Sequence, residues 1–385
     1  MSKDSHDILS LFAEPTPSVV PVLVPMPAER PYSYMVPEGM HVQPGSIVRV
    51  PLGPREVAGI VCDGATDAVD AKKLRAISEV FDCPPVDAQM LRFMRWAADY
   101  TLSPPGMVAR MVLRAPAAFD PEPKVPGLRY NGHEPERMTD ARARVMELAR
   151  DGLAWTRSGL AHAAGVSLTV VDGLKTQGVF EEVMLPPPAV VAAPDTDYSR
   201  ATLSEDQQAA AEMLAESVEE DSFSVSLLDG VTGSGKTEVY FEAVAKALEM
   251  GKQVLILLPE IALTQQFLDR FHDRFGAKPA EWHSDLAPRT RERVWRQIAE
   301  GTVRVVAGAR SALFLPFKEL GLIVVDEEHD PAYKQEDRVF YNARDMAVVR
   351  GHIGGFPVIL ASATPSIESQ VNADQGRYKR IKLYG

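Results

Sequence analysis

The sequence predicts a multidomain chain with a small β-rich domain first, a short helical domain second and a larger α/β domain with a parallel sheet last. Prolines gather at 115–135 and 186–197, and because proline fixes φ and lacks an amide donor, these two segments should be extended linkers. Short β-branched runs precede the first linker, and apolar runs alternate with helical stretches after the second. The expected boundaries are a flexible 1–17 and then domains at 18–114, 136–185 and 198–385.

The composition fits a soluble globular protein. A chain of 385 residues is long enough for two or three domains, and its 45% hydrophobic and 24% charged content is ordinary. The net charge of −12 argues against nonspecific nucleic-acid binding over the whole surface. A local basic groove remains compatible with that charge, because the field inside a cleft decides what binds there.

Two cysteines, Cys62 and Cys83, are too few for a disulfide framework or a four-ligand zinc site. This low count suits a reducing compartment. The N-terminus lacks the basic and then apolar pattern of a signal peptide, and no apolar run reaches the roughly 18 residues of a membrane span. The sequence therefore predicts a cytoplasmic protein without membrane contact.

The first domain is expected to be a small barrel-like β structure. Its β-branched runs are separated by proline and glycine turns and lie at 19–25, 32–37, 46–51 and 57–61. Met90 to Thr101 then shows helical spacing, with Leu91, Met94 and Ala98 on one face.

The second domain reads as helix, turn, helix and strand. Helices are expected at 141–150, 158–164 and 168–177, with a tight turn at Gly165 and a helix N-cap at Ser167. A β-wing strand is expected at 178–183. This order is the winged-helix pattern, with a small helical spacer as the alternative.

The third domain alternates strands and helices, as a parallel sheet requires. Strands are expected at 224–228, 254–258, 303–307, 322–325 and 358–361, and helices at 237–250 and 264–275. Residues 230–237 match the pattern G-x-x-x-x-G-K-[ST] in full, between a strand and a helix. Glycines let the backbone wrap phosphates, and successive amides and the helix N-terminus favour negative charge. The predicted ATP-binding residues here are Gly230, Thr232, Gly233, Ser234, Gly235, Lys236 and Thr237.

Within this site, Lys236 should reach the β- and γ-phosphates and Thr237 should hold Mg²⁺ through its hydroxyl. Asp326-Glu327-Glu328-His329 follows an apolar strand downstream. A carboxylate at that strand end can hold Mg²⁺ while the next activates water. We therefore assign Asp326 to the metal and Glu327 to the general base, with ATP and Mg²⁺ as the cofactors.

This D-E-x-H motif resembles the motif of superfamily 2 helicases, and two further segments are similar. Residues 259–264 follow the second strand, where that superfamily contacts the DNA backbone. Ser362-Ala363-Thr364 follows the last strand, in the place of the segment that links hydrolysis to strand movement. The resemblance implies that His329, Ser362 and Thr364 couple ATP hydrolysis to DNA.

Other segments resemble the primosomal replication-restart DNA helicases. They lie at 30–34, 36–39, 308–316, 326–330, 333–335, 340–341 and 343–345, so the resemblance runs from about residue 19 to the final residues. It implies an ATPase that moves 3′ to 5′ on DNA at stalled forks. It also implies, as partners, branched forks, the 3′ end of the leading strand, single-stranded DNA, single-stranded DNA-binding protein and other primosome proteins.

By the same resemblance the first domain captures the 3′ end, the second contacts fork duplex and the third is the first motor lobe. Gln207 occupies the position that would recognise adenine. The aromatic-rich segment 333–341 would couple DNA binding to hydrolysis by stacking on bases, with core packing as the alternative. The DNA-binding residues implied are Tyr32, Ser33, Gly53, Arg310, Tyr333, Lys334, Phe340 and Tyr341.

The sequence departs from the family pattern in three places. Ser33 stands where an Asp is typical, and Asn342 stands where a His is common. The sequence ends at Gly385, and the family's zinc segment and second motor lobe, whose arginine contributes on the order of 10³–10⁵ in rate, would follow. We therefore expect no zinc in this chain, weak nucleotide binding, poor hydrolysis and no unwinding by the chain alone.

Two other functions remain open from the sequence. One is a different P-loop enzyme, such as a kinase, which would not need segments 259–264 and 362–364. The other is a fork-end DNA-binding module without motor activity, against which the intact lysine, threonine and carboxylates argue.

Overall fold

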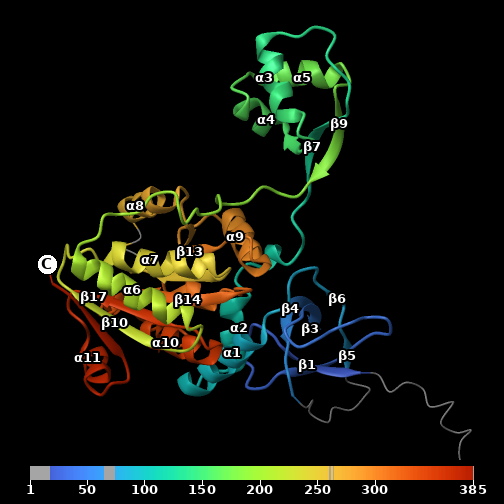
Figure 1. The fold of residues 1–385 in the computed structure, drawn as a ribbon. Helices are drawn as coiled ribbons and strands as arrows, with labels where there is room; N and C mark the ends of the chain where they lie inside the picture. Colours follow the sequence, from blue (N-terminus) through green and yellow to red (C-terminus); the bar gives the residue numbers. More distant parts are fainter. Residues whose placement is uncertain (1–17, 65–73, 260–261, 263, 385) are drawn as a thin grey trace, which may run out of the picture. The chain divides into compact units, whose positions relative to one another are not determined.

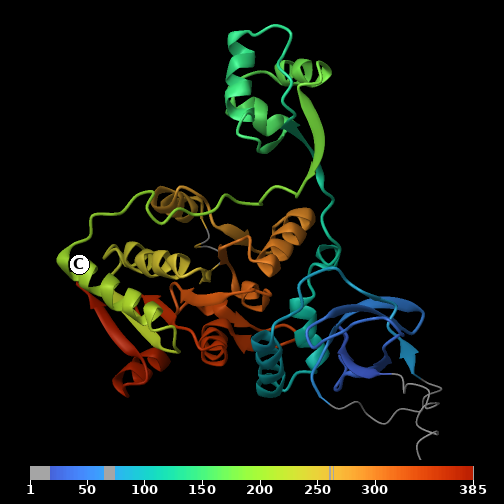
Figure 2. The same ribbon diagram turned by 45° about the vertical axis from the view of Figure 1, so that its right-hand side comes forward.

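A computed structural model describes residues 18–64, 74–259, 262 and 264–384, so the segment expected to be flexible, 1–17, lies outside the described residues. The chain forms two compact units, one from residues up to 120 together with 189 onward, and one from 121–188. Figures 1 and 2 show the elements of each unit.

The first part of the larger unit is a six-stranded sheet with the order β5-β2-β1-β4-β3-β6. Its strands are β1 (Val19–Leu23), β2 (Tyr32–Met35), β3 (Ile47–Leu52), β4 (Arg55–Val61), β5 (Arg75–Ala76) and β6 (Glu79–Val80). Valines from β1, β3 and β4 pack with Tyr34 in its core. The predicted β-rich domain is therefore confirmed.

Two helices follow this sheet, α1 (Ala88–Thr101) and α2 (Pro105–Val112). Asp87 caps α1 by accepting a 2.7 Å hydrogen bond from the amide of Met90. Leu102 ends the helix with a left-handed backbone, φ 51°. A short 3₁₀ turn, η3 (Pro116–Ala118), comes next.

The rest of the larger unit is a parallel sheet of seven strands in the order β12-β13-β11-β14-β17-β10-β18. Its strands are β10 (Val225–Gly230), β11 (Gln253–Leu257), β12 (Ala280–Trp282), β13 (Val305–Gly308), β14 (Leu320–Val325), β17 (Val358–Ser362) and β18 (Lys379–Leu383). Its helices are α6 (Glu205–Glu219), α7 (Lys236–Glu249), α8 (Gln265–Phe275), α9 (Pro288–Glu300), α10 (Ala343–Gly354) and α11 (Ile367–Asp374). Two 3₁₀ turns, η4 (Arg310–Phe314) and η5 (Pro331–Tyr333), and a hairpin of β15 (Lys334–Gln335) and β16 (Tyr341–Asn342) complete it.

Successive side chains of the parallel strands enter opposite cores, as strand geometry requires. Val254 and Ile256 of β11 pack in the core that holds residues of α6, α7 and α8. Leu255 and Leu257 pack in the core that holds residues of α9 and α10. Because both faces are covered, these strands are short continuous apolar runs, which is why the sequence located them.

The first domain and the parallel-sheet domain share this second core. Residues of α1, α2 and η3 belong to it together with those of α9 and α10. The indole Nε1 of Trp295 donates a 3.0 Å hydrogen bond to the carbonyl of Val112, and its ring lies 5.1 Å from that of Phe119. Phe93 of α1 lies 5.4 Å from Phe314. The sequence predicts a linker from 115, whereas residues 115–120 here belong to the larger unit.

The smaller unit contains three helices and a three-stranded antiparallel sheet, β8-β7-β9, which is the winged-helix arrangement expected. Its elements are β7 (Val125–Tyr130), α3 (Asp140–Ala149), β8 (Ala154–Thr156), α4 (Arg157–Ala163), α5 (Leu168–Thr176) and β9 (Phe180–Leu185). Ser167 stands at the N-cap of α5 as expected, but its side chain makes no capping hydrogen bond.

Strand β7 lies in the segment expected to be a linker, because the surrounding prolines hide its apolar residues. Pro126 pairs with Met184 of β9, and pairing with β8 begins only at Gly127. Pro126 therefore lies where β7 has one neighbouring strand, a position that tolerates a missing amide donor. In the described part of the chain, no helix has the length and apolar character needed to cross a bilayer.

Candidate functional site

The predicted functional segments meet at one edge of the parallel sheet. They follow the carboxyl ends of β10, β13, β14 and β17, and strand ends of the same kind in a parallel sheet lie along one edge. The segment predicted after β11 is only partly described, since Glu260, Ile261 and Leu263 lie outside the described residues.

The loop after β10 has the backbone of a phosphate-binding cradle. Gly233 and Gly235 have φ of 82° and 81°, a left-handed backbone that side chains other than glycine rarely adopt. Lys236 is the first residue of α7, and its Nζ donates to the carbonyl of Gly230 at 2.7 Å. The Oγ of Ser234 is buried without a hydrogen-bond partner in the described structure. A bound phosphate would supply an acceptor for these donors.

Gln207 lies against this loop. Its Nε2 donates a 2.9 Å hydrogen bond to the carbonyl of Ser234, and its Oε1 accepts from the amide of Ser204 to close a capping box on α6. The family resemblance implies adenine recognition by this residue, and the structure places its amide beside the phosphate loop.

The two side chains predicted to hold Mg²⁺ are joined through a third that the sequence did not single out. The hydroxyl of Tyr240 donates a 2.9 Å hydrogen bond to Oδ2 of Asp326 and also hydrogen-bonds Thr237. Burial raises the pKa of Asp326 above its usual range, and the bond from Tyr240 opposes that rise. Tyr240 stands one helical turn after Thr237 on α7, so the two side chains lie on the same face of the helix. This spacing was the signal in the sequence that could have identified Tyr240 as a neighbour of the magnesium site.

These residues fit a magnesium nucleotide. No group of three or more His, Cys, Asp or Glu side chains in the described residues has the geometry of a metal site. Magnesium does not require one, because it keeps waters and phosphate oxygens and takes only one or two protein ligands. Thr237 and Asp326 would hold the ion, which would draw charge from the phosphates when bound.

Glu327, predicted to be the general base, has an unusual backbone. Its φ is 47°, a left-handed conformation that is strained for a residue other than glycine. Its amide donates to Oδ1 of Asp326 at 2.9 Å, and its carboxylate lies 3.6 Å from Nδ1 of His329. The strained turn holds the carboxylates of Asp326 and Glu327 at one strand end.

The predicted coupling residues contact one another. Nδ1 of His329 lies 2.8 Å from the hydroxyl of Ser362, and the same hydroxyl accepts from the amide of Thr364 at 3.0 Å. The end of β14 is thus connected to the end of β17 by side chains.

Glu328 lies on a second connection that sequence reasoning missed. It is 1% exposed, forms a 3.2 Å ion pair with Arg344 and accepts hydrogen bonds from Ser366 and Ser369. These partners come from α10 and from the start of α11. Glu328 is therefore a structural carboxylate between the catalytic candidate Glu327 and the coupling candidate His329, and the sequence run alone did not distinguish it from them.

Two of the aromatic residues predicted to stack on DNA bases do not fit that role. Tyr333 is 1% exposed, and its hydroxyl donates to the carbonyls of Leu257 and Asp326 at 3.0 and 2.5 Å. Tyr341 is 6% exposed, and its ring lies 5.5 Å from that of Phe314. Core packing, the alternative interpretation, is correct for both rings because the hairpin β15–β16 folds onto the shared core.

Other residues of that segment remain accessible. Phe340 is 62% exposed, and Lys334 is exposed. Arg310 donates to the carbonyls of Ala332 and Lys334 at 2.9 and 2.8 Å, which fixes its guanidinium beside the hairpin.

In the first domain, the predicted 3′-end residues come together only in part. Gly53 has φ 61°, and its carbonyl accepts a 2.8 Å hydrogen bond from Arg75. Burial raises the pKa of Tyr34, with Tyr32 raising it further and Arg75 lowering it, so these three side chains are neighbours. Strand alternation places Ser33 on the other face of β2 from Tyr32. Arg75 is a cation near Tyr32 and Gly53 that the sequence did not single out.

Comparisons with known proteins agree with this geometry. A family model described as 3′DNA-binding domain (3′BD) of PriA matches residues 21–114, and one described as DEAD/DEAH box helicase matches residues 204–372. The replication restart protein PriA of Rickettsia felis is 35% identical over 366 residues, which cover 95% of this chain and 46% of that protein. The chain is thus similar to PriA proteins over nearly its whole length. The PriA protein of Bacillus subtilis is 30% identical over 438 residues, which cover 92% of this chain and 54% of that protein.

The similarity lies in the N-terminal portion of the PriA relatives, and the chain spans about half of their length. Among solved structures, one described as RecG bound to a three-way DNA junction matches at 23% identity and a TM-score of 0.38. That match covers 49% of this chain and 24% of the RecG chain. The helicase fold and the resemblance to PriA proteins predicted from the sequence are both confirmed.

Proposed function

We propose that the chain carries the DNA-end-binding and nucleotide-binding parts of an ATP-dependent 3′-to-5′ DNA helicase of replication restart. In this proposal it acts in the cytoplasm, where it recognises stalled forks and starts primosome assembly. The observation that carries the proposal is one chain in which a PriA-type 3′DNA-binding domain shares a core with a sheet bearing Lys236, Thr237 and Asp326.

At the sheet edge, Lys236 binds the β- and γ-phosphates, and Thr237 and Asp326 hold Mg²⁺. Gln207 recognises adenine, and Glu327 activates the attacking water. His329, Ser362 and Thr364 transmit the state of the site to DNA, supported by the hydrogen bonds between their side chains and backbone.

In the first domain, Tyr32 stacks on the terminal base, and Gly53 with Arg75 lies beside the terminal ribose. Ser33 takes part only if the DNA reaches the other face of β2. The proposed protein partners are single-stranded DNA-binding protein and other primosome proteins.

Equilibrium binding to forks with and without a free 3′-hydroxyl on the leading strand tests the end-binding part. Tighter binding to the free hydroxyl, reduced by Tyr32→Ala but not by Tyr198→Phe at an exposed tyrosine elsewhere, supports it. Equal affinity for both forks contradicts it.

Binding of a fluorescent ATP analogue, with and without Mg²⁺, tests the nucleotide part. Lys236→Ala should abolish the Mg²⁺-dependent binding, whereas Lys318→Ala at the opposite edge should not. Turnover and strand polarity are best measured on this chain and on a chain extended to the length of its PriA relatives. Unwinding in the 5′-to-3′ direction by the longer chain would contradict the proposal.

A further inference from the structure

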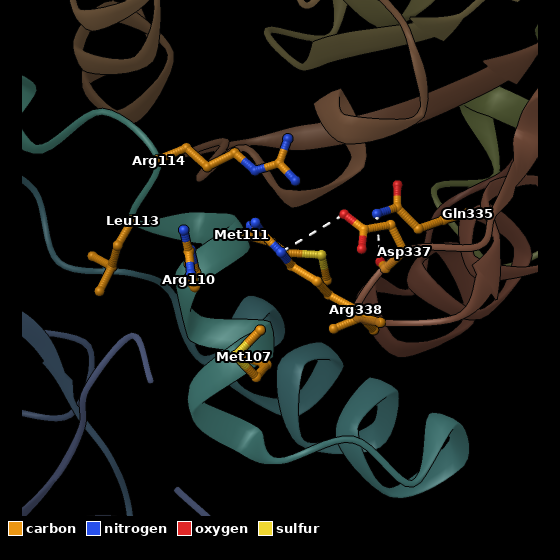
Figure 3. A pocket seen from close by; sticks show the side chains of 9 residues that line it. Met107, Arg110, Met111, Leu113, Arg114, Gln335, Asp337 and Arg338 are labelled. Atoms are coloured by element: carbon orange, nitrogen blue, oxygen red, sulfur yellow. Dashed lines mark hydrogen bonds and ion pairs between the residues drawn. The ribbon is translucent and has the colours of Figure 1, made fainter. Parts of the chain in front are cut away.

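A basic groove runs along the larger unit where the first domain meets the parallel-sheet domain. Helix α2 and the residues after it supply Met107, Arg110 and Arg114, and the hairpin supplies Gln335 and Arg338. These residues line a cavity of 310 Å³. In Figure 3, Arg338 extends from the hairpin toward α2, and Arg110 and Arg114 lie on the α2 side of the same space.

The cavity continues into a second one of 410 Å³, since both are lined by Arg114 and Gln335. The second cavity adds Arg291 of α9 and Arg310, the first residue of η4. Arg291 donates to the carbonyl of Ser284 at 2.8 Å, and Arg310 is held by the carbonyls described above. Both guanidiniums are therefore positioned by neutral carbonyl groups, and these hydrogen bonds do not neutralise their positive charge.

The groove carries far more positive than negative charge. Its side chains include five arginines, and the one carboxylate among its described lining residues is Asp337, 3.7 Å from Arg338. Among the described residues, neither Arg110 nor Arg114 has a hydrogen-bond or ion-pair partner. Five like charges are gathered here in a chain whose net charge is −12. Such a concentration of charge in a cleft attracts anions.

The electrostatic effects of these groups on one another show that they lie close together. Burial lowers the pKa of Arg114, Tyr341 raises it, and Arg291, Arg110 and Arg338 lower it further. The hydroxyl of Tyr341 is buried without a partner in the described structure, and both Arg114 and Arg310 act on its pKa. Arg338 has φ 63°, a strained backbone that other contacts must hold.

We propose that this groove binds the sugar–phosphate backbone of single-stranded DNA, with Arg110, Arg114 and Arg338 contacting phosphates. The proposal rests on the proposed function, because it extends the DNA path between the end-binding domain and the motor domain. Arg110 and Arg114 lie within the matched 3′DNA-binding domain, and Arg310 and Arg338 lie within the matched helicase domain.

Single-stranded DNA fits these features better than an acidic peptide does. Phe340 follows the groove residue Val339 and is 62% exposed, and an accessible aromatic beside clustered cations is typical of single-strand binding surfaces. Arginines from four separate elements line an open path through two joined cavities, which suits a continuous backbone with regularly spaced charges.

The test uses the full chain and a fluorescent oligodeoxythymidylate whose 3′ end carries a phosphate, so that the end pocket does not decide the affinity. The triple variant Arg110→Ala, Arg114→Ala, Arg338→Ala should bind about 100-fold more weakly at low salt. Its plot of log affinity against log salt should be shallower by about 2, from roughly 0.7 for each phosphate contact on a single strand. Replacing the same arginines by lysine should restore most of the affinity.

The control removes the same charge at the opposite edge of the sheet with Lys318→Ala, Arg377→Ala and Lys379→Ala. It should leave affinity and salt dependence unchanged. Thermal melting and ATP-analogue binding equal to those of the parent chain show that the variants are folded.

The proposal is overturned if the triple arginine variant binds the oligonucleotide as tightly as the parent chain does. It is also overturned if the control variant loses as much affinity as the arginine variant. An acidic peptide that binds more tightly than the oligonucleotide through the same arginines also overturns it. If the arginine variant loses oligonucleotide binding but still discriminates a free 3′-hydroxyl on forks, the groove is supported as a site separate from the end pocket. A parent chain that binds no single-stranded DNA contradicts both the groove and the proposed function.

Discussion

The hydroxyl of Tyr240 donates a 2.9 Å hydrogen bond to the carboxylate of Asp326, and it also hydrogen-bonds Thr237. One buried phenol thus orients both side chains that we assign to magnesium. Neither side chain is free to turn away from the cradle while that phenol is in place, so Tyr240 is a positioning residue for the nucleotide site.

Removing this hydroxyl should weaken magnesium nucleotide binding without unfolding the chain. A hydrogen bond to a charged group contributes about 1.5–3 kcal/mol, so Tyr240→Phe should lower Mg²⁺–ATP affinity by about 10- to 100-fold. Nucleotide binding without Mg²⁺ should change little. Calorimetric titration in both conditions measures this, with Tyr198→Phe as the control. An equal loss with and without Mg²⁺ would indicate a general structural role instead.

The affinity for Mg²⁺–ATP should depend on pH through Asp326. Burial raises the pKa of this carboxyl, and it must be ionised to hold the cation. Affinity should therefore fall on acidification at a higher pH than an ordinary aspartate would cause. The hydrogen bond from Tyr240 lowers the pKa of Asp326, so its loss in Tyr240→Phe should raise that pKa further. The pH at which affinity falls should then be higher still. A profile that Asp326→Asn leaves unchanged would assign the titration to another group.

Ionisation of Asp326 favours Mg²⁺–ATP binding, but it lowers the stability of the nucleotide-free chain. A raised pKa in the folded state means that protonation of Asp326 favours folding, and this contribution is lost as pH rises through the folded pKa. Asp326→Asn should therefore be more stable than the parent chain at neutral pH. Urea unfolding at neutral and acidic pH should show the difference disappearing at low pH.

The ion pair of Glu328 and Arg344 should be essential for the fold near β14. Breaking a buried pair by removing one partner costs about 3–5 kcal/mol, so Arg344→Ala should destabilise the larger unit by that amount. The double variant Glu328→Gln, Arg344→Met should recover part of the loss, since no charge is left buried alone. Arg49→Ala, at the exposed pair with Glu79, should cost less than about 1 kcal/mol. Equal effects at both pairs would contradict the burial argument.

Phe340 and Tyr333 should respond differently to substitution. Stacking on a base contributes about 1–3 kcal/mol, so Phe340→Ala should weaken single-stranded DNA binding by roughly tenfold and leave the melting temperature unchanged. Tyr333→Phe should lower stability, because two buried carbonyls lose their donor, while DNA affinity is retained. Fluorescence anisotropy measures the DNA affinity of both variants, and thermal melting measures their stability. A loss of DNA affinity in Tyr333→Phe without a loss of stability would indicate that Tyr333 contacts a base.

The sequence predicted those parts of the fold whose signal is local. The loop of Lys236 follows a fixed pattern of glycines, and the strand before Asp326 is an unbroken apolar run because helices cover both of its faces. Parallel pairing then places strand ends at one edge, which is why the catalytic candidates of distant segments come together.

The parts that failed depend on contacts between segments far apart in the chain. Tyr333 and Tyr341 look like accessible loop aromatics until the hairpin packs on Phe314. Val125–Tyr130 reads as a linker until β8 and β9 pair with it. Nothing in the acidic run shows that Glu328 turns inward to an arginine from α10.

The core shared by the two domains should make their stabilities inseparable. Trp295 is 1% exposed and bonded to Val112, and truncating such a residue costs about 3–5 kcal/mol. Trp295→Ala should therefore lower the unfolding midpoint of the whole larger unit as one transition. Trp155→Ala, in the separate unit, should leave that transition in place. Two independent transitions within the larger unit would contradict a common core.

The contact between Trp295 and Phe119 also limits how this chain can vary among relatives. Although the two matched regions look like exchangeable modules, Trp295 of the second one is held by Val112 of the first and by Phe119, which closely follows it. A recombination event that joined the first domain of one lineage to the lobe of another would leave mismatched rings and an unpaired indole donor. The two domains should therefore have been inherited together, and the residues that face each other across their shared core should covary among relatives.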